Sequence, residues 1–117
     1  MINTTGDFKS IIRKTFSQDA NQSIKRAFQA IRIATNYELL NIQKFLEQQS
    51  MILDKNSMLM VITFHSLEER IISQQFQVWK KELLGDLGTK RPLMPSEAEN
   101  IENPRSKSAK LYTFLFQ

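Results

Sequence analysis

Apolar residues in the first half of the chain recur with the spacing of amphipathic helices. Thr4 or Thr5 is placed to cap a short helix, whose apolar stripe consists of Phe8, Ile11, Ile12 and Phe16. A longer helix is predicted over residues 22–48, because apolar side chains recur there every three or four positions. The N-terminal part of the chain is therefore expected to be helical.

The second half of the chain changes to a strand pattern and then returns to a helical one. Residues 58–64 are apolar at nearly every position, which is typical of a strand covered on both faces in a parallel sheet. Ser66 and Glu69 form a Ser-x-x-Glu capping box, which predicts a helix with Ser66 as its N-cap. Residues 85–110 are polar, contain three prolines and predict a long surface loop, and residues 111–116 predict a terminal strand.

This order of elements predicts a piece of an α/β sheet rather than a whole one. A parallel-type strand that is buried on both faces needs neighbours at both edges, and the pattern offers at most one other strand. We therefore expect either that the chain is part of a larger sheet or that another chain supplies the remaining strands.

Composition excludes some classes of functional site but does not identify the function. The 117 residues are 41% hydrophobic and 24% charged, as in ordinary globular domains, and the net charge of +4 permits a nucleic-acid partner without demanding one. The sequence has no cysteine, which excludes disulfides and thiolate zinc sites, and its three glycines do not form a phosphate-binding loop. No apolar stretch approaches the ~18 residues of a membrane span, and the first residues show no targeting signal, so no membrane partner is expected.

His65 is the single histidine, and it stands where the predicted inner strand ends and the next helix begins. Ligands of open α/β sheets bind beyond the carboxyl ends of the strands, so Phe64, His65 and Ser66 occupy a position that favours function. The alternative is structural, with Ser66 capping the helix and His65 bonding to nearby backbone. Without a second histidine or a cysteine, the sequence predicts neither a metal cluster nor a catalytic triad.

Two sets of polar residues could contact RNA. One face of the long predicted helix carries Lys25, Gln29, Arg32 and Asn36. This face could instead be solvated, with Arg32 tying the helix to a neighbouring loop. In the long loop, three cations alternate with small residues and could follow an RNA backbone, namely Arg105, Lys107 and Lys110. Three glutamates in the same loop weaken its positive electrostatic field, and the loop could equally pack on its own domain.

Three blocks of sequence carry a resemblance to a known family. Residues 26–39, RAFQAIRIATNYEL, resemble a block R-T-F-Q-A-L-R-I-A-V-N-x-E-L, and residues 63–70, TFHSLEER, are similar to S-F-H-S-L-E-D-R. Residues 90–111 resemble a closing block that ends N-P-R-x-R-S-A-K-L. Their order and spacing resemble the last third of the RsmH (MraW) family, the S-adenosylmethionine-dependent methyltransferases that modify N4 of a cytidine in small-subunit ribosomal RNA.

The resemblance implies an α/β fold, an incomplete Rossmann-like methyltransferase sheet. Residues 58–64 would be its buried, parallel-type inner strand, and residues 111–116 a terminal antiparallel strand beside it. Residues 1–48 would be the end of a helical insertion, and residues 49–117, including the loop 85–110, part of the Rossmann-like domain. Phe64, His65 and Ser66 would border the target-cytidine pocket, where His65 would orient the base or help to remove its proton. The implied RNA contacts are Arg26, Gln29, Arg32, Asn36, Arg105, Lys107 and Lys110. The implied partner is small-subunit rRNA or the ribosome, in the cytoplasm. The many Asn, Gln, Lys and Ile residues would suit an organellar ribosome as an alternative, and the unpaired strand edge predicts a second chain that completes the sheet.

S-adenosylmethionine is implied as methyl donor, but the family's glycine-rich cofactor loop and acidic ribose partner have no counterpart in this sequence. The chain alone is therefore expected to be inactive. One hypothesis is a methyltransferase segment that works only when the other half is supplied. A second is a non-catalytic structural or RNA-binding component of a ribosome, and a third is a helical interaction module whose family motifs serve packing.

Overall fold

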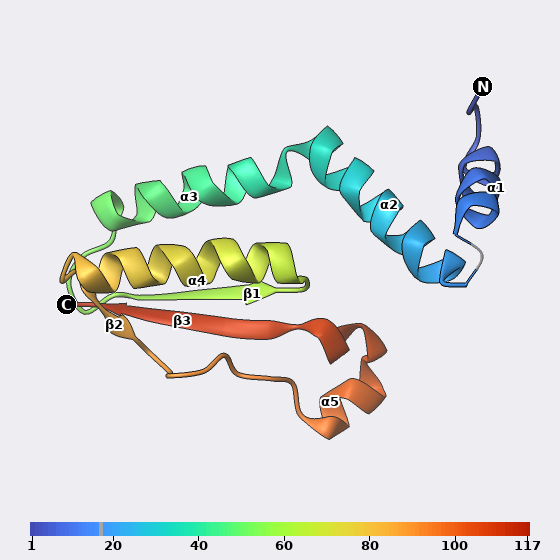
Figure 1. The fold of residues 1–117 in the computed structure, drawn as a ribbon. Helices are drawn as coiled ribbons and strands as arrows, with labels where there is room; N and C mark the ends of the chain where they lie inside the picture. Colours follow the sequence, from blue (N-terminus) through green and yellow to red (C-terminus); the bar gives the residue numbers. More distant parts are fainter. Residues whose placement is uncertain (17) are drawn as a thin grey trace. The chain divides into compact units, whose positions relative to one another are not determined.

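The computed structural model describes residues 1–16 and 18–117 and divides them into two compact units, Met1–Glu38 and Leu39–Gln117. The elements in chain order are α1 (Thr5–Thr15), α2 (Ala20–Asn36), α3 (Glu38–Ile52), β1 (Met58–Thr63), α4 (Ser66–Lys81), β2 (Gly85–Leu87), α5 (Glu97–Glu102), a 3-10 helix (Pro104–Ser108) and β3 (Lys110–Phe116) (Figure 1). The units divide at residue 38, whereas the sequence places the domain boundary at residue 48. No helix of the described residues is long and apolar enough to cross a membrane.

The N-terminal unit is a pair of helices that begins at the predicted cap. The Thr4 hydroxyl accepts a hydrogen bond from the Asp7 amide at 3.1 Å, and the Asp7 carboxylate accepts from the amides of Asn3 and Thr4. These bonds, that from Asn3 first, hold the pKa of Asp7 below its ordinary value. Between the helices, Phe8 of α1 meets Phe28 of α2 edge to face, with ring centroids 5.2 Å apart.

The single long helix predicted over residues 22–48 is wrong, because the chain breaks it at Tyr37. This residue adopts a left-handed conformation with φ of 52°, so α2 ends at Asn36 and α3 begins at Glu38. The apolar spacing continues through the break, because this spacing depends on which side of each helix is buried. It does not show whether the two segments form one continuous helix. Ile24 of α2 is buried in the N-terminal unit, whereas Leu46 of α3 is buried in the core of the other.

The C-terminal unit is built on a three-stranded antiparallel sheet in the order β1-β3-β2. The central strand is β3, which pairs with β1 from Met58↔Leu115 to Thr63↔Lys110 and with β2 from Gly85↔Phe116 to Leu87↔Phe114. The predicted terminal strand beside residues 58–64 is therefore confirmed. β1 lies at the edge of the sheet, and within the described residues no other strand lies beside its second edge.

The prediction that residues 58–64 form a parallel-type strand covered on both faces is wrong for this chain. All observed pairing is antiparallel, and only the face carrying Leu59, Val61 and Thr63 is turned toward α3 and α4. Met58, Met60 and Ile62 alternate with these residues and are about half exposed. Apolar side chains therefore lie on both faces of this strand, and the other described residues cover only one of the two faces.

Aromatic side chains form the core between α4 and the sheet. Trp79 is 1% exposed, and its ring lies 5.6, 5.3 and 5.1 Å from the rings of Phe76, Phe114 and Phe116. Leu46 of α3 belongs to the same buried cluster. Burial of this apolar surface is the main term that holds the two helices on the sheet.

The segment 85–110 is not a structureless loop, which corrects the prediction. It contains β2, α5 and the 3-10 helix, and Leu93 forms an isolated bridge with Leu111 of β3. Each of these elements is too short to show a hydrophobic period. One signal was nevertheless present, because Ser96 and Glu99 have capping-box spacing, and the Ser96 hydroxyl accepts from the Glu99 amide at 3.1 Å.

Gly85 allows β2 to approach β3, and its replacement by alanine is expected to destabilise the C-terminal unit. A Cβ atom at this position would collide with the Leu115 carbonyl group, which belongs to the backbone of β3 and has little freedom to move. We expect a loss of about 1–3 kcal/mol in the free energy of unfolding, measured by urea denaturation. Gly6→Ala is the matched control, since a Cβ there meets only the Thr4 hydroxyl at 3.6 Å. Equal stability of the Gly85→Ala variant and wild type would contradict the assignment.

Candidate functional site

An open cleft of about 640 Å³ lies where β1 ends, between the uncovered face of the sheet and the segment that leads into β3. Its floor is apolar and includes Ile62, Leu93 and Leu111. Its polar lining comes from Glu99 of α5, from the 3-10 helix with Arg105, and from Lys110 at the start of β3. Phe64, which is 54% exposed, also lines the cleft. The structure therefore brings three of the predicted site residues together.

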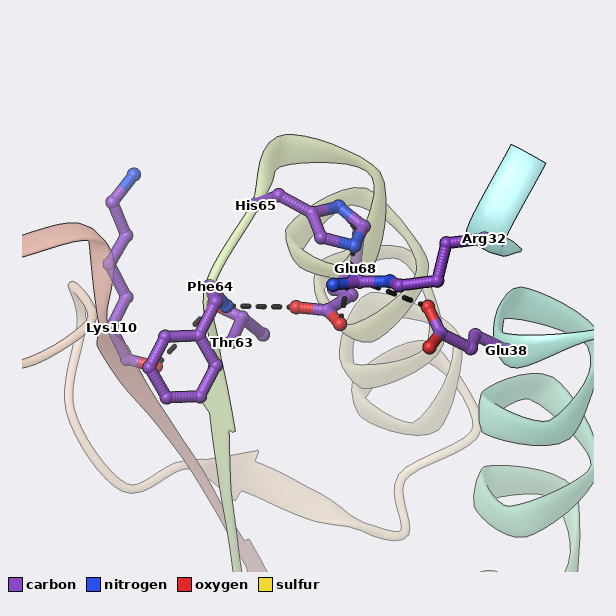
Figure 2. Close-up of polar contacts among 7 residues, drawn as sticks. All are labelled: Arg32, Glu38, Thr63, Phe64, His65, Glu68 and Lys110. Carbon is purple, nitrogen blue, oxygen red and sulfur yellow. Dashed lines mark hydrogen bonds and ion pairs between the residues drawn. The ribbon is translucent and has the colours of Figure 1, made fainter. Parts of the chain in front are cut away.

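The turn from β1 into α4 is capped by His65, not by Ser66 as the sequence predicts. His65 has extended backbone dihedrals, and its Nδ1 accepts a hydrogen bond from the Glu68 amide at 3.4 Å. The Glu68 carboxylate turns back and accepts a hydrogen bond from the Phe64 amide at 2.8 Å (Figure 2). The N-cap is thus shifted by one residue, and Ser66 is the first residue of α4. Glu68 stands at N3, but it accepts from the residue before the cap, so the reciprocal bond of a capping box is replaced by one to Phe64.

Lys110 is held by an ion pair with Glu69. Its Nζ lies 2.9 and 3.0 Å from the two carboxylate oxygens of Glu69 on α4. At the same end of the sheet, the Thr63 hydroxyl donates to the Lys110 carbonyl oxygen at 3.4 Å (Figure 2). The hydrogen bond with Glu69 raises the pKa of Lys110 above its ordinary 10.5. The Lys110 charge is therefore already engaged within the protein, which limits its availability for RNA.

The Lys110–Glu69 pair is expected to stabilise the protein at neutral pH and to lose this effect in alkali. The pKa of Lys110 is higher in the folded chain, so its contribution is complete below the unfolded value of 10.5 and disappears as pH rises through the folded value. The difference in urea midpoint between wild type and Lys110→Met should therefore shrink above pH 10.5. Lys107→Met removes the same charge from an exposed position and controls for net charge. A difference that persists unchanged in alkali would rule out the pair as its source.

The 3-10 helix positions Arg105 at the cleft. Ser106 is buried, and its hydroxyl donates to Asn100 Oδ1 of α5 at 2.9 Å, which fixes the short helix against α5. Arg105 is exposed and lines the cleft, whereas the neighbouring Lys107 is exposed and is not part of its lining. Of the three loop cations predicted from the sequence, Arg105 has both the position and the exposure to meet an anionic ligand in the cleft.

The other predicted RNA contacts lie on α2 in the N-terminal unit. Arg26, Arg32 and Asn36 are exposed, and Gln29 is half-buried. The Arg32 guanidinium lies 3.3 Å from the Glu38 carboxylate (Figure 2). The alternative prediction was that Arg32 ties the helix to a neighbouring loop; its partner is instead the first residue of α3, so the pair spans the break at Tyr37. An RNA-binding role of this helix stays a prediction.

Two acidic residues of α4 were missed as parts of the site. Glu68 holds the Phe64 backbone and faces His65, and Glu69 holds Lys110. Both belong to the TFHSLEER block, but only the three-dimensional placement distinguishes their partners. Among the described residues, no group of three or more His, Asp or Glu side chains is placed to hold a metal ion.

Comparison with known proteins finds consistent relatives over nearly the whole chain. The model of the MraW methylase family matches residues 1–116. The chain is 40% identical to the ribosomal RNA small subunit methyltransferase H of Sulfurihydrogenibium sp. (strain YO3AOP1) over 94% of its own length and 39% of that protein's. It is 40% identical to the protein of the same name from Coprothermobacter proteolyticus, over 97% of this chain and 38% of that protein. It is 41% identical to the one from Ehrlichia ruminantium (strain Gardel), over 98% of this chain and 42% of that protein. The chain thus spans about two fifths of the length of the curated relatives that it matches.

Proposed function

Because the chain belongs to the MraW methylase family, we propose that it is the part of a small-subunit rRNA methyltransferase that borders the target base. The relatives are named ribosomal RNA small subunit methyltransferase H. By resemblance, the accepting group is the N4 amino group of a cytidine. The activity is proposed for the assembled methylase, to which these 117 residues contribute one wall of the site.

The cleft beyond β1 is the observation that carries this proposal. It presents a half-exposed aromatic ring, that of Phe64, and a guanidinium group, that of Arg105, on a largely apolar floor. Bases extruded from RNA stack on aromatic side chains, and arginine binds phosphate or stacks on a base plane. A cleft that combines these groups is suited to a single nucleotide. Its place beyond the carboxyl end of β1 also matches the usual position of ligands in α/β sheets.

The free edge of β1 supports a place within a larger Rossmann-like sheet. Apolar side chains lie on both faces of this strand, with Met58, Met60 and Ile62 exposed on one face and a hollow of about 290 Å³ beside Phe45 and Val61 on the other. A strand added at this edge would pair with the free backbone N–H and C=O groups of β1, and the helices that accompany a larger sheet would cover its exposed apolar face. The added strand would come from the remaining part of the methylase or from a partner chain. In this proposal, residues 1–48 belong to the helical insertion and residues 49–117 to the catalytic domain.

The residues of this chain do not fit a site for the methyl donor. S-adenosylmethionine, when bound, supplies the methyl group. Dinucleotide and cofactor loops need glycines that let the backbone approach the ligand. Gly85 and Gly88 instead lie against Leu115 and Thr113, where added Cβ atoms would collide with β3, and Gly6 lies in the first turn of α1. Gly85 and Gly88 therefore serve packing against β3, Gly6 lies within a helix, and no step through the donor is assigned to this segment.

The contribution of this chain to the reaction is orientation of the base. A cytosine amino group is a weak nucleophile, so its rate of attack depends on being held in line with the methyl group. Phe64 would fix the plane of the base, and Arg105 would fix the backbone phosphate or the base edge. The backbone at both positions is anchored by the fold, at Phe64 through the bond of its amide to Glu68 and at Arg105 through the buried neighbour Ser106.

Reconstitution tests the proposed function. The chain would be produced with the complementary three fifths of the Sulfurihydrogenibium relative, and transfer of a labelled methyl group from S-adenosylmethionine to small-subunit rRNA would be measured. We expect transfer with both parts together and none with either part alone. RNA binding without transfer by a stable complex of the two parts would overturn the proposal and favour a non-catalytic RNA-binding component.

A further inference from the structure

His65 is the obvious candidate for a proton acceptor, since it is the single histidine and adjoins the cleft residue Phe64. Proton removal requires a ring nitrogen with a free lone pair within reach of the substrate. The geometry of the β1–α4 turn shows which group each ring nitrogen faces, and both groups belong to Glu68.

The Nδ1 atom acts as the acceptor of the helix cap. It receives the Glu68 amide proton at 3.4 Å, so it carries no proton of its own in this arrangement. The His65 carbonyl oxygen accepts from the Glu69 amide at 3.2 Å, as an N-cap residue does. A proton on Nδ1 would face the Glu68 N–H and abolish the cap. The tautomer that fits the turn is therefore the one protonated on Nε2.

The Nε2 atom faces the carboxylate of the same glutamate. It lies 3.2 Å from Glu68 Oε1, within ion-pair distance, although it is not aligned as a straight hydrogen bond. The second oxygen of this carboxylate, Oε2, accepts the Phe64 amide proton at 2.8 Å. Glu68 thus connects the imidazole ring to the backbone of the residue whose side chain lines the cleft (Figure 2).

We propose that His65 is a positioning residue, which caps α4 and, through Glu68, fixes Phe64 at the cleft, and that it does not accept the proton of the substrate amino group. This inference rests on the proposed function for its link to the reaction. The assignment of the tautomer and of the cap concerns the chain alone.

The first arm of the test uses the wild-type chain without RNA or donor. Because the sequence has one histidine, a long-range proton–nitrogen NMR spectrum gives the signals of one imidazole ring. We expect Nδ1 to have the shift of an unprotonated nitrogen and Nε2 that of a protonated one at neutral pH. The reverse tautomer, or equal populations of the two, would overturn the proposal.

The second arm uses His65→Asn and His65→Ala. Asparagine is a favoured N-cap residue but cannot act as a general base, whereas alanine can do neither. We expect the folding equilibrium constant to fall about fivefold for His65→Ala and to change much less for His65→Asn. In the reconstituted methylase, His65→Asn should keep methyl transfer within about threefold of wild type and keep the shape of the pH profile. Loss of a general base would instead cost both variants about 10²–10⁴-fold.

The outcomes separate this inference from the proposed function. A loss of a hundredfold or more in His65→Asn, with its stability intact, overturns the positioning role. If wild type shows no transfer after reconstitution, the proposed function fails, and the tautomer and the stability of the two variants still decide whether His65 is the cap. Should His65→Asn not fold, the cap assignment is wrong, because asparagine supplies an equivalent acceptor.

Discussion

Replacing Trp79 by alanine is expected to unfold the C-terminal unit at room temperature or to leave it marginally folded. The indole is 1% exposed and contacts the rings of Phe76, Phe114 and Phe116, so it links α4 to the central strand. Truncation of a buried tryptophan costs about 3–5 kcal/mol. A small domain is stable by only about 5–15 kcal/mol in total, so this loss takes a large share of its stability.

Circular dichroism during urea denaturation measures this effect. Trp79→Phe keeps an aromatic ring in the cluster and should lie between wild type and Trp79→Ala. Val78→Ala is the matched control, because Val78 is the preceding residue of α4 and is 44% exposed. A Trp79→Ala variant whose urea midpoint equals that of Val78→Ala would contradict the structure of the core.

Elements with long or uniform hydrophobic patterns could be predicted from the sequence. The strands β1 and β3 and the helix α4 follow from apolar runs and from helical spacing, and the Thr4 cap follows from its side-chain chemistry. The expectation of an unfilled sheet edge also agrees with the position of β1 in the sheet. In each case, a local signal in the sequence is enough to specify the local structure.

Features that depend on a single backbone angle or on distant partners could not be predicted. The left-handed residue at Tyr37 leaves the apolar spacing intact, so the pattern indicates one helix where there are two. The start of α4 contains both a His-x-x-Glu and a Ser-x-x-Glu pair; the Ser-x-x-Glu pattern predicts Ser66 as the N-cap, whereas the structure uses His65. Which of the two neighbouring residues becomes the N-cap depends on the point at which the backbone leaves β1.

The cleft was predicted only in part for the same reason. The position of Phe64 follows from its place after the strand, but the opposite wall depends on the bridge between Leu93 and Leu111 and on the bond between Ser106 and Asn100. Lys110 was expected to face RNA, and the antiparallel register instead places it beside Glu69 of α4. Such pairings are set by register, which a single sequence does not show.

Phe64→Leu is expected to lower kcat/KM for methyl transfer by the reconstituted methylase by about fivefold to a hundredfold. This range corresponds to the about 1–3 kcal/mol that stacking of one base on an aromatic ring contributes. Leucine keeps the side chain apolar but removes the aromatic face, so the base loses the surface that holds its plane. Because the ring is 54% exposed, the substitution should change the free energy of unfolding little.

Two variants make this result specific to stacking. Phe64→Trp retains an aromatic face and should keep most of the activity, while Val78→Ala, on the exposed side of α4, should leave it unchanged. The measurement is the initial rate of methyl transfer as a function of RNA concentration, with urea denaturation of each variant as the check on folding. If Phe64→Leu and Phe64→Trp were equally active, the aromatic face would have no part in base binding. The cleft would then hold the RNA through Arg105 and its apolar floor, and Arg105→Ala would be the substitution that raises KM.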